Sequence, residues 1–312
     1  MVVDEPVVLE PLVPAALPSA SSASTVQIEQ DETIFCVDYD RCNREFAKEA
    51  CIDFVGEKID TLASGIMREL FEISETSRLV SEDRLHFNLT NPENPKYSRT
   101  LATLPKERMK HYLDIMARDK TQMLIRQTQG FAVNHKSILD AVKQKLIESI
   151  VFDKFGADSL RIFRLLMMKK LLEQKQVAEL AMTPIKDTRD SLYKMLQHNF
   201  VHLQEVPRTS EHIPAKTFYL WSVRIPHVQA LLVTEIYKTL RNLRHRLSHT
   251  LTAHADLLAK RDEEQRIQAE TPKYARLTDA DLQTLSDIQT IQERLEVSIH
   301  HLDKSVMTLE DF

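Results

Sequence analysis

The residues of this chain that could do chemistry do not follow the spacing of a catalytic or phosphate-binding motif. Phosphate loops, dinucleotide fingerprints and nucleophile elbows need clustered glycines, because the backbone there approaches a ligand closely or takes positive φ. The chain has four glycines, at positions 56, 65, 130 and 156. Their scatter excludes all three motifs. Serine, histidine and aspartate are present, but no motif places them as a triad, so we expect no catalysis by this chain alone.

Histidine and cysteine offer one weak metal candidate. His245 and His249 are four residues apart on a predicted helix, a geometry that can ligate zinc. However, no glutamate follows His245 as in HExxH, and no third ligand is evident, so a solvated helix face is the favoured interpretation. Cys36, Cys42 and Cys51 match no zinc template and no C-x-x-C spacing, which fits free thiols in a reducing compartment. The sequence predicts neither a metal nor a cofactor.

Composition indicates a mostly helical protein. The chain has 312 residues, of which 43% are hydrophobic, 28% charged and 6% aromatic. Many charged residues together with few glycines and few aromatic residues are typical of a mostly helical chain. No apolar run approaches the roughly 18 residues of a membrane span, so we expect no membrane association. Residues 1–35 carry six acidic residues and no Lys or Arg, which leaves a net charge of +1 for all the others. Bulk charge therefore predicts no strong attraction to nucleic acid.

The patterning divides the chain into four predicted regions. Residues 1–33 are rich in Pro, Ala, Ser and acidic residues and are typical of a disordered arm or linker. Residues 34–156 predict helices, with a proline-containing loop near 88–98 and a hairpin turning at 127–130, in the order of a winged helix. Residues 157–224 show that order more clearly, with three amphipathic helices and then two strands. The fourth region, 225–312, predicts an antiparallel coiled-coil hairpin.

The predicted hairpin rests on apolar residues that recur in steps of three and four. Such spacing forms an a/d seam, which two helices bury by packing together. The sequence leaves open whether the hairpin closes on itself or meets a partner. The seam residues are Ile236, Leu240, Leu243 and Leu247 in the first helix and Leu285, Ile288, Leu295, Ile299 and Leu302 in the second.

The third helix of the region 157–224 is its candidate recognition helix. Its polar face and the following wing supply side chains that could contact phosphates, base edges or a protein. Asp187 and Asp190 share the helix, and the region has 11 Lys or Arg against 7 Asp or Glu. This balance is only mildly basic, so a solvated or protein-docking face is favoured over DNA binding. The candidate residues are Lys186, Arg189, Tyr193, Lys194, Gln197, Arg208 and Lys216.

Six short runs within this region resemble one family closely. They are RIFRL (161–165), EQKQV (173–177), AMTP (181–184), LYKML (192–196), LQEVP (203–207) and TFYL (217–220). In this order they resemble the TFIIE-α-like subunit of RNA polymerase III, the large winged-helix member of its dissociable initiation subcomplex. The resemblance covers about residues 33–312. Members of that family carry four winged helices and a coiled coil, and this chain matches the C-terminal half, with the third and fourth winged helices.

The resemblance implies a mainly α fold with small β-hairpins, in which tandem winged helices precede the coiled coil. It implies a non-catalytic, nuclear subunit that docks on the polymerase III clamp and assists promoter opening and initiation. The implied partners are the polymerase core, a TFIIE-β-like winged-helix subunit and a small acidic subunit, with promoter DNA as a further contact. Two alternatives remain: a free-standing winged-helix DNA-binding regulator dimerised by its coiled coil, and a scaffold of a different assembly.

Overall fold

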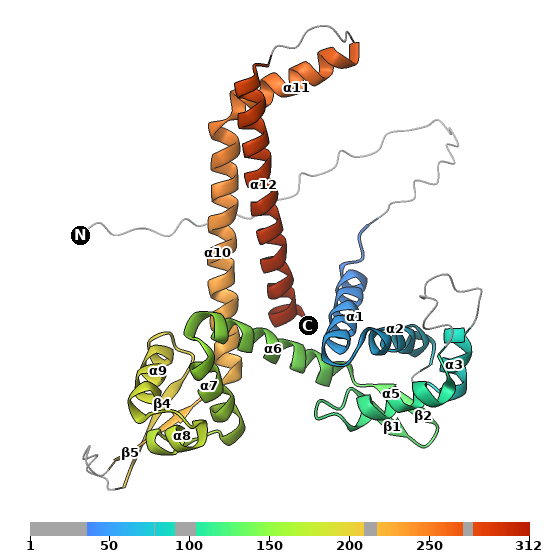
Figure 1. Ribbon diagram of the computed structural model, residues 1–312, viewed down its shortest axis with the longest axis vertical. Helices are drawn as coiled ribbons and strands as arrows, with labels where there is room; N and C mark the ends of the chain where they lie inside the picture. The colour runs from blue at the N-terminus through green and yellow to red at the C-terminus, as the bar shows by residue number, and fades with distance from the viewer. Residues whose placement is uncertain (1–35, 78, 91–103, 209–216, 271–276) are drawn as a thin grey trace, which may run out of the picture. The chain divides into compact units, whose positions relative to one another are not determined.

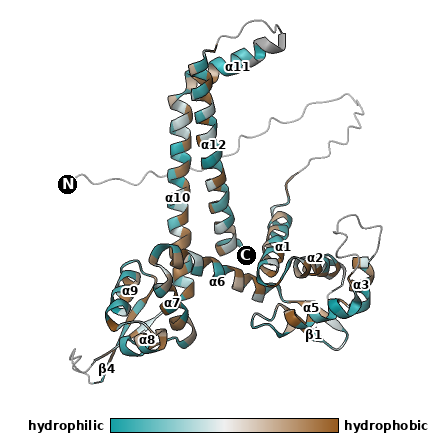
Figure 2. Cartoon of the chain, in the orientation of Figure 1, coloured by the Kyte–Doolittle hydropathy of each residue, from teal (hydrophilic) through white to brown (hydrophobic). Residues whose placement is uncertain are grey.

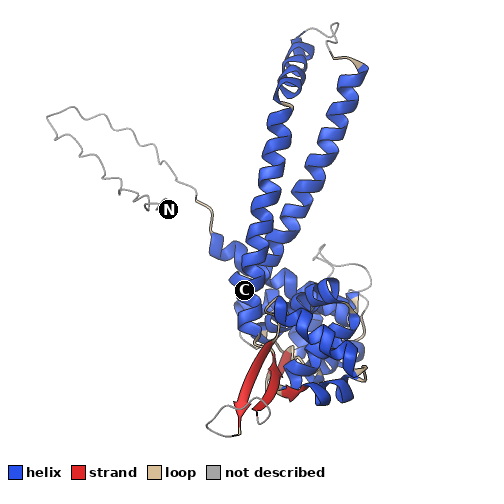
Figure 3. Cartoon of the chain, turned by 90° about the vertical axis from the view of Figure 1, so that its left-hand side faces the viewer, coloured by secondary structure: helices blue, strands red, loops and turns tan. Residues whose placement is uncertain are grey.

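The computed structural model describes residues 36–77, 79–90, 104–208, 217–270 and 277–312 (Figure 1). The arm predicted over residues 1–33 lies outside this part of the chain. Contacts group the described residues from Tyr39 to Phe312 into one compact unit. As the sequence predicts, the described residues are mainly helical with small antiparallel sheets (Figure 3).

The first module has the element order of a winged helix, preceded by an additional helix. Three helices, α2, α3 and α5, lead into the β1–β2 hairpin, and α6 follows it. Two sequence expectations were wrong here. Helix α3 was not predicted and includes Asn88, which was assigned to a loop. Pro105 suits the first turn of the helix that follows it, but in the structure it is the N-cap of α5. The bounds are α1 Tyr39–Lys58, α2 Thr61–Thr76, α3 Glu82–Thr90, α5 Lys106–Arg118, β1 Leu124–Gln127, β2 Gly130–Val133 and α6 His135–Phe155.

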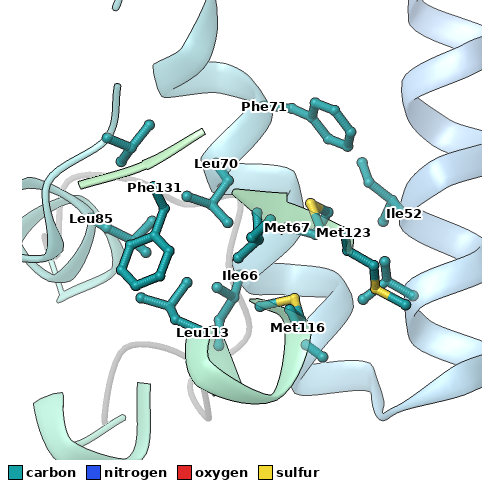
Figure 4. Close-up of a cluster of buried hydrophobic side chains, with 14 of the residues drawn as sticks. Ile52, Ile66, Met67, Leu70, Phe71, Leu85, Leu113, Met116, Met123 and Phe131 are labelled. Carbon is teal, nitrogen blue, oxygen red and sulfur yellow. The ribbon is translucent and has the colours of Figure 1, made fainter. Parts of the chain in front are cut away.

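A hydrophobic core built from α2, α5 and the hairpin stabilises this module. Figure 4 shows Met67, Leu70, Leu113, Met116 and Phe131 converging from these elements. All five are at most 4% exposed, because the apolar residues of α2 and α5 recur every three or four positions and so share one helix face. The sequence predicts these stripes, because Ile66, Leu70 and Ile73 recur at steps of four and three, as do Met109, Leu113 and Met116, and the burial of all six confirms them.

The hairpin of this module is extended by one further backbone pair. Val80 and Phe131 exchange both of their backbone hydrogen bonds, each with an N···O distance of 2.9 Å. Gly130 precedes this pair with φ +152°, and a Cβ there would overlap the Val80 carbonyl group. The close approach of the two chains therefore requires glycine at this position.

The second module is a winged helix with a three-stranded sheet in the order β3-β5-β4. The two long strands pair antiparallel from His202 opposite Ser222 to Pro207 opposite Thr217. Strand β3 has two residues, which pair with Trp221 and Leu220, and it was not predicted from the sequence. The bounds are α7 Ala157–Lys169, β3 Leu172–Glu173, α8 Gln174–Ala181, α9 Ile185–Gln197, β4 His202–Pro207 and β5 Thr217–Ser222.

Helix α6 contributes to two hydrophobic cores. Ile138, near its beginning, belongs to the core of the first module. Ile147 and Val151, further along, belong to a second core that also holds Phe200 of the winged helix and Val228 of the next helix. Because α6 supplies residues to both cores, they do not mark a boundary at 156/157, and the domain division there stays a prediction.

The C-terminal region forms a helical hairpin that closes on itself. Helices α10 (Ile225–Ala253) and α12 (Asp279–Val306) run side by side and contact each other, and in Figure 2 hydrophobic and hydrophilic residues alternate along both. Helix α10 ends at Ala253, and a separate helix, α11 (Ala255–Glu270), begins after the single intervening residue His254. The predicted helix break near Thr271 lies outside the described residues.

The base of the hairpin joins the winged-helix core. Leu232 and Ile236 of α10 and Val306 of α12 are each at most 7% exposed and pack with the winged-helix residues. The last turn, η2 (Met307–Asp311), completes this base with the fully buried Leu309. The Gln229 side-chain amide donates to the Leu309 carbonyl oxygen, which ties the end of the chain to α10.

The three cysteines differ in burial, and this difference predicts their reactivity. Cys36 and Cys42 are exposed, whereas Cys51 is fully buried in α1 and burial raises its thiol pKa to about 12. Because the thiolate is the reactive form, we expect Ellman's reagent to label two thiols quickly at about pH 8 and the third only after denaturant is added. Equal labelling rates for all three thiols would contradict the burial of Cys51.

None of the helices in the described ranges is both long and apolar enough to cross a bilayer. Within the same ranges, histidine, cysteine, aspartate and glutamate do not gather in groups of three that could hold a metal ion. His245 and His249 both lie exposed on α10, where they face solvent.

Candidate functional site

Helix α9 forms because its apolar residues share one face. Thr188, Leu192 and Met195 recur at steps of four and three and are fully buried against the rest of the winged helix. The sequence Thr183-Pro184 predicts a threonine N-cap followed by a first-turn proline, but in the structure Pro184 itself occupies the N-cap. The Thr183 hydroxyl instead lies 2.7 Å from the Thr188 hydroxyl, which itself donates to the Pro184 carbonyl at 3.0 Å. This pairing satisfies a buried hydroxyl next to the helix start.

The structure brings the five candidate residues of α9 together on its exposed side. Tyr193 is 53% exposed, and the edge of its ring meets Trp221 of β5 with the centroids 5.6 Å apart and the planes at 85°. This edge-to-face contact fixes the helix against the sheet. The other four side chains, Lys186, Arg189, Lys194 and Gln197, point into solvent.

The exposed side of α9 carries little net charge. Asp187 and Asp190 are exposed among its three basic residues, and the Arg189 Nε atom lies 3.8 Å from an Asp190 carboxylate oxygen. Protein surfaces that bind DNA need several uncompensated cations, because the phosphates provide most of the affinity. The observed balance of +1 along the helix falls short of that requirement.

The candidate wing is described only at its base. The Arg208 guanidinium lies over the Phe218 ring of β5, 4.1 Å from its centroid, so a cation–π contact holds it against the sheet. Lys216, the other candidate in the wing, lies outside the described residues. The structure therefore places Arg208 on the sheet and leaves the wing as a prediction.

An exposed apolar surface lies at the turn between α8 and α9, and the sequence interpretation missed it. Leu180 is 52% exposed, Met182 is 87% exposed and Ile185 is 60% exposed. The spacing of Val177 and Leu180 predicts that both are buried, but Val177, Ala178 and Ala181 fill the inner face of this short helix instead. The apolar pattern over 158–172 likewise predicts a buried Leu171, which is 43% exposed because α7 ends two residues earlier at Lys169. We call Leu180, Met182 and Ile185 the apolar turn.

The apolar turn occupies the position at which a DNA-binding helix-turn-helix approaches the duplex. The N-terminus of a recognition helix favours phosphate contacts, because its free N–H groups point outward. In this chain Pro184 has no N–H to offer, and the flanking side chains are apolar. The apolar turn is therefore better suited to contact an apolar surface of another protein than a phosphate backbone.

Two lysines on the corresponding helix of the first module are paired with carboxylates of α3. On α5, Lys106 pairs with Asp83, and the Lys110 Nζ atom lies 3.0 Å from a Glu82 carboxylate oxygen. The hydrogen bond from Lys106 lowers the pKa of the Asp83 carboxyl, which keeps the pair ionised. Because α3 pairs with these two lysines, fewer of the cations of α5 are available to contact phosphates.

Comparison with known proteins identifies the second module. Residues 147–223 match the family model described as POLR3C, C-terminal winged-helix domain. This match begins where the second core begins and ends just after β5. The resemblance stated from the sequence runs is thereby confirmed.

The similarity to relatives of this winged helix extends over most of the chain. The DNA-directed RNA polymerase III subunit rpc3 of Dictyostelium discoideum is 33% identical over 276 residues, which are 83% of this chain and 41% of that protein. The RPC3 subunit of Mus musculus is 29% identical over 88% of this chain and 53% of its own length, and that of Homo sapiens is 29% identical over 95% and 57%. The chain spans about half the length of the curated relatives it matches.

Asp119 in the first module has a strongly lowered pKa, and its role is structural. Burial of Asp119 opposes its ionisation, but hydrogen bonds from Lys58, at 2.5 Å, and from the Thr121 side chain and backbone outweigh it and lower the pKa to about 2. Asp119 caps the end of α5, and Lys58 ends α1, so the group joins two helix ends. These bonds stabilise the module.

Proposed function

We propose that this chain acts as a non-catalytic subunit of DNA-directed RNA polymerase III. The observation that carries the proposal is the similarity to RPC3 subunits over 83% or more of the chain, with a POLR3C-type winged helix at its centre. The surface chemistry supports it: a nearly neutral recognition helix and an apolar turn are suited to protein docking. The chain would act in the nucleus, in the initiation of small untranslated RNA genes.

The proposed partners follow from the family resemblance. They are the polymerase III core at its clamp, a TFIIE-β-like winged-helix subunit and a small acidic subunit. The chain would assist promoter opening by holding its winged helices beside the template, with weak phosphate contacts made useful by the high local concentration within the assembly. The alternative of a dimeric DNA-binding regulator is not favoured, because α10 and α12 bury their seam against each other within one chain.

Affinity purification of the tagged chain from cells tests the proposal. We expect it to recover polymerase III subunits. In the variant Met182→Glu with Ile185→Glu, charge on the apolar turn should reduce that recovery about tenfold, because apolar contacts at an interface centre carry much of its affinity. Recovery of the chain alone, under conditions that keep the other subunits together, would contradict the proposal.

A second variant separates docking from DNA contact. Lys186→Glu, Arg189→Glu and Arg208→Glu together should leave subunit recovery and the circular dichroism spectrum unchanged, because all three side chains are exposed and Arg208 gives up only a surface contact with the Phe218 ring. We expect them to weaken formation of the promoter complex, measured by gel shift of the polymerase on a polymerase III promoter. Unchanged transcription by polymerase that has incorporated this variant would show that the face does not touch DNA.

A further inference from the structure

Helix α10 carries an unusual run of positive charge. Residues 236–255 contain no Asp or Glu, and they include Lys238, Arg241, Arg244 and Arg246, all exposed. Within the described part of the chain, Arg241 and Lys238 have no ion pair, and Arg244 has only a long one, at 3.8 Å from Asp303. The run is thus largely uncompensated, although the chain as a whole is acidic.

A groove opens at this run, on the side where α10 meets α12. Its volume is about 410 Å³, and it is lined by Tyr237, Leu240, Arg241, Arg244, His245 and Asp303. Leu240, only 5% exposed, gives it an apolar floor, and the half-exposed Tyr237 ring gives it an apolar wall. The Tyr237 hydroxyl donates to a Glu310 carboxylate oxygen at 2.8 Å, so the C-terminal turn fixes that wall in place.

The groove combines apolar surface with cations directed at the same space. Arg241 and Arg244 line it next to Leu240, and among the described residues only Arg244 has a carboxylate near it, at 3.8 Å in Asp303, so an apolar side chain over Leu240 would lie beside two guanidinium groups. Guanidinium groups bind carboxylates through two parallel hydrogen bonds, which gives both strength and orientation. From Tyr237 to His245 the helix rises about 12 Å at about 1.5 Å per residue. That length matches about four residues of extended peptide.

The carboxylates beside the groove distinguish two negatively charged ligands that it could bind, a nucleic acid and an acidic peptide. Asp303 lines it, and Glu310 and Asp311 lie close enough to Tyr237 to raise the pKa of its hydroxyl, after the hydrogen bond to Glu310. A continuous phosphate backbone would meet these carboxylates with repulsion. A peptide can place its acidic side chains on Arg241 and Arg244 and an apolar side chain over Leu240, and so avoid them.

We propose that this groove binds an acidic peptide segment of a partner protein, one that carries an apolar residue between carboxylates. The proposal does not rest on the polymerase assignment, since charge, groove and apolar floor all belong to the hairpin itself. It adds a second interaction surface, distinct from the apolar turn of the winged helix.

Fluorescence anisotropy with the full chain tests this proposal. The probe is a labelled synthetic peptide of alternating Glu and Asp around a Leu-Phe pair, and the comparison peptide has Gln and Asn in place of every acid. We expect saturable binding of the acidic peptide that weakens with added salt, and no binding of the neutral one. Arg241→Gln with Arg244→Gln should weaken the binding about tenfold.

A matched control removes the same charge elsewhere. Lys260→Gln with Arg266→Gln, exposed on α11, should leave the affinity within about twofold of the unchanged chain. Circular dichroism should show that both double variants keep the helicity of the unchanged chain, as glutamine is nearly as good a helix former as arginine. Equal loss in both double variants, equal binding of the neutral peptide, or no saturation by about 1 mM peptide would overturn the proposal. Tighter binding of a DNA duplex of the same net charge would overturn it in favour of nucleic acid.

Discussion

Gly130→Ala is expected to lower the free energy of unfolding by about 3 kcal/mol, the upper end of the range for a strained backbone position. Gly130 has φ +152°, which side chains of L-residues rarely adopt, and an added Cβ would lie 2.8 Å from the Val80 carbonyl carbon. Relief of the overlap would break the backbone pair between Val80 and Phe131, and Phe131 belongs to the first core. Urea unfolding followed by circular dichroism measures the loss.

The other glycines provide graded controls. Gly156→Ala has the backbone strain without the overlap, since φ is +87° but no atom lies within 4 Å, so we expect a loss of about 1 kcal/mol. Gly56→Ala lies within α1 and would approach the Ser64 Cβ to 3.2 Å, so its gain in helix propensity should roughly cancel that contact. If the two variants Gly130→Ala and Gly156→Ala unfold at the same urea concentration, Gly130 does not approach the Val80 carbonyl group as closely as the structure shows.

Leu295→Asp combined with Leu302→Asp is expected to open the C-terminal hairpin. Leu295 is 7% exposed, and Leu302 packs against the second core, so each change places a charge in apolar surroundings. Each such charge costs several kcal/mol without a partner, and we expect a combined loss of about 4 kcal/mol or more. Circular dichroism should show reduced helicity, and the winged helix should melt at a lower temperature because it shares its core with the hairpin base.

Two exposed positions on the same helix control for the added charge. Ile291 and Val297 are 39% and 55% exposed on α12, so Ile291→Asp with Val297→Asp should change stability by only about 0.5 kcal/mol per site. The two double variants have the same length and net charge. If they melt alike, the seam positions do not face α10.

Periodicity made most of the fold predictable. Leu232, Ile236 and Leu240 are buried at the spacing that predicted the seam, and Leu192 and Met195 of α9 are buried as its stripe required. Such positions follow local geometry, because residues three or four apart share a helix face. Short elements were not predictable in this way: β3 has two residues and exists only because β5 lies alongside to pair with it.

The candidate surfaces were predictable in part. The exposed face of α9 followed from the stripe opposite to it, and the structure shows it where expected. The apolar turn was missed, because an apolar residue such as Leu180 is assigned to the interior by its type, and only the packing of Ala178 and Ala181 reveals the opposite. The groove on α10 depends on Asp303 and Glu310, which lie near in space but far along the chain. The absence of acids over 236–255 was the signal in the sequence that could have pointed to it.

Helix α6 has a consequence for how this protein can be divided. One end of the helix holds Ile138 in the first core and the other holds Val151 in the second. A cut anywhere along it would expose an apolar strip on both fragments and leave each with an open cavity. A fragment of either module would therefore need the part of this helix that fills its core, and an exchange of one module for a foreign counterpart would have to preserve both sets of contacts.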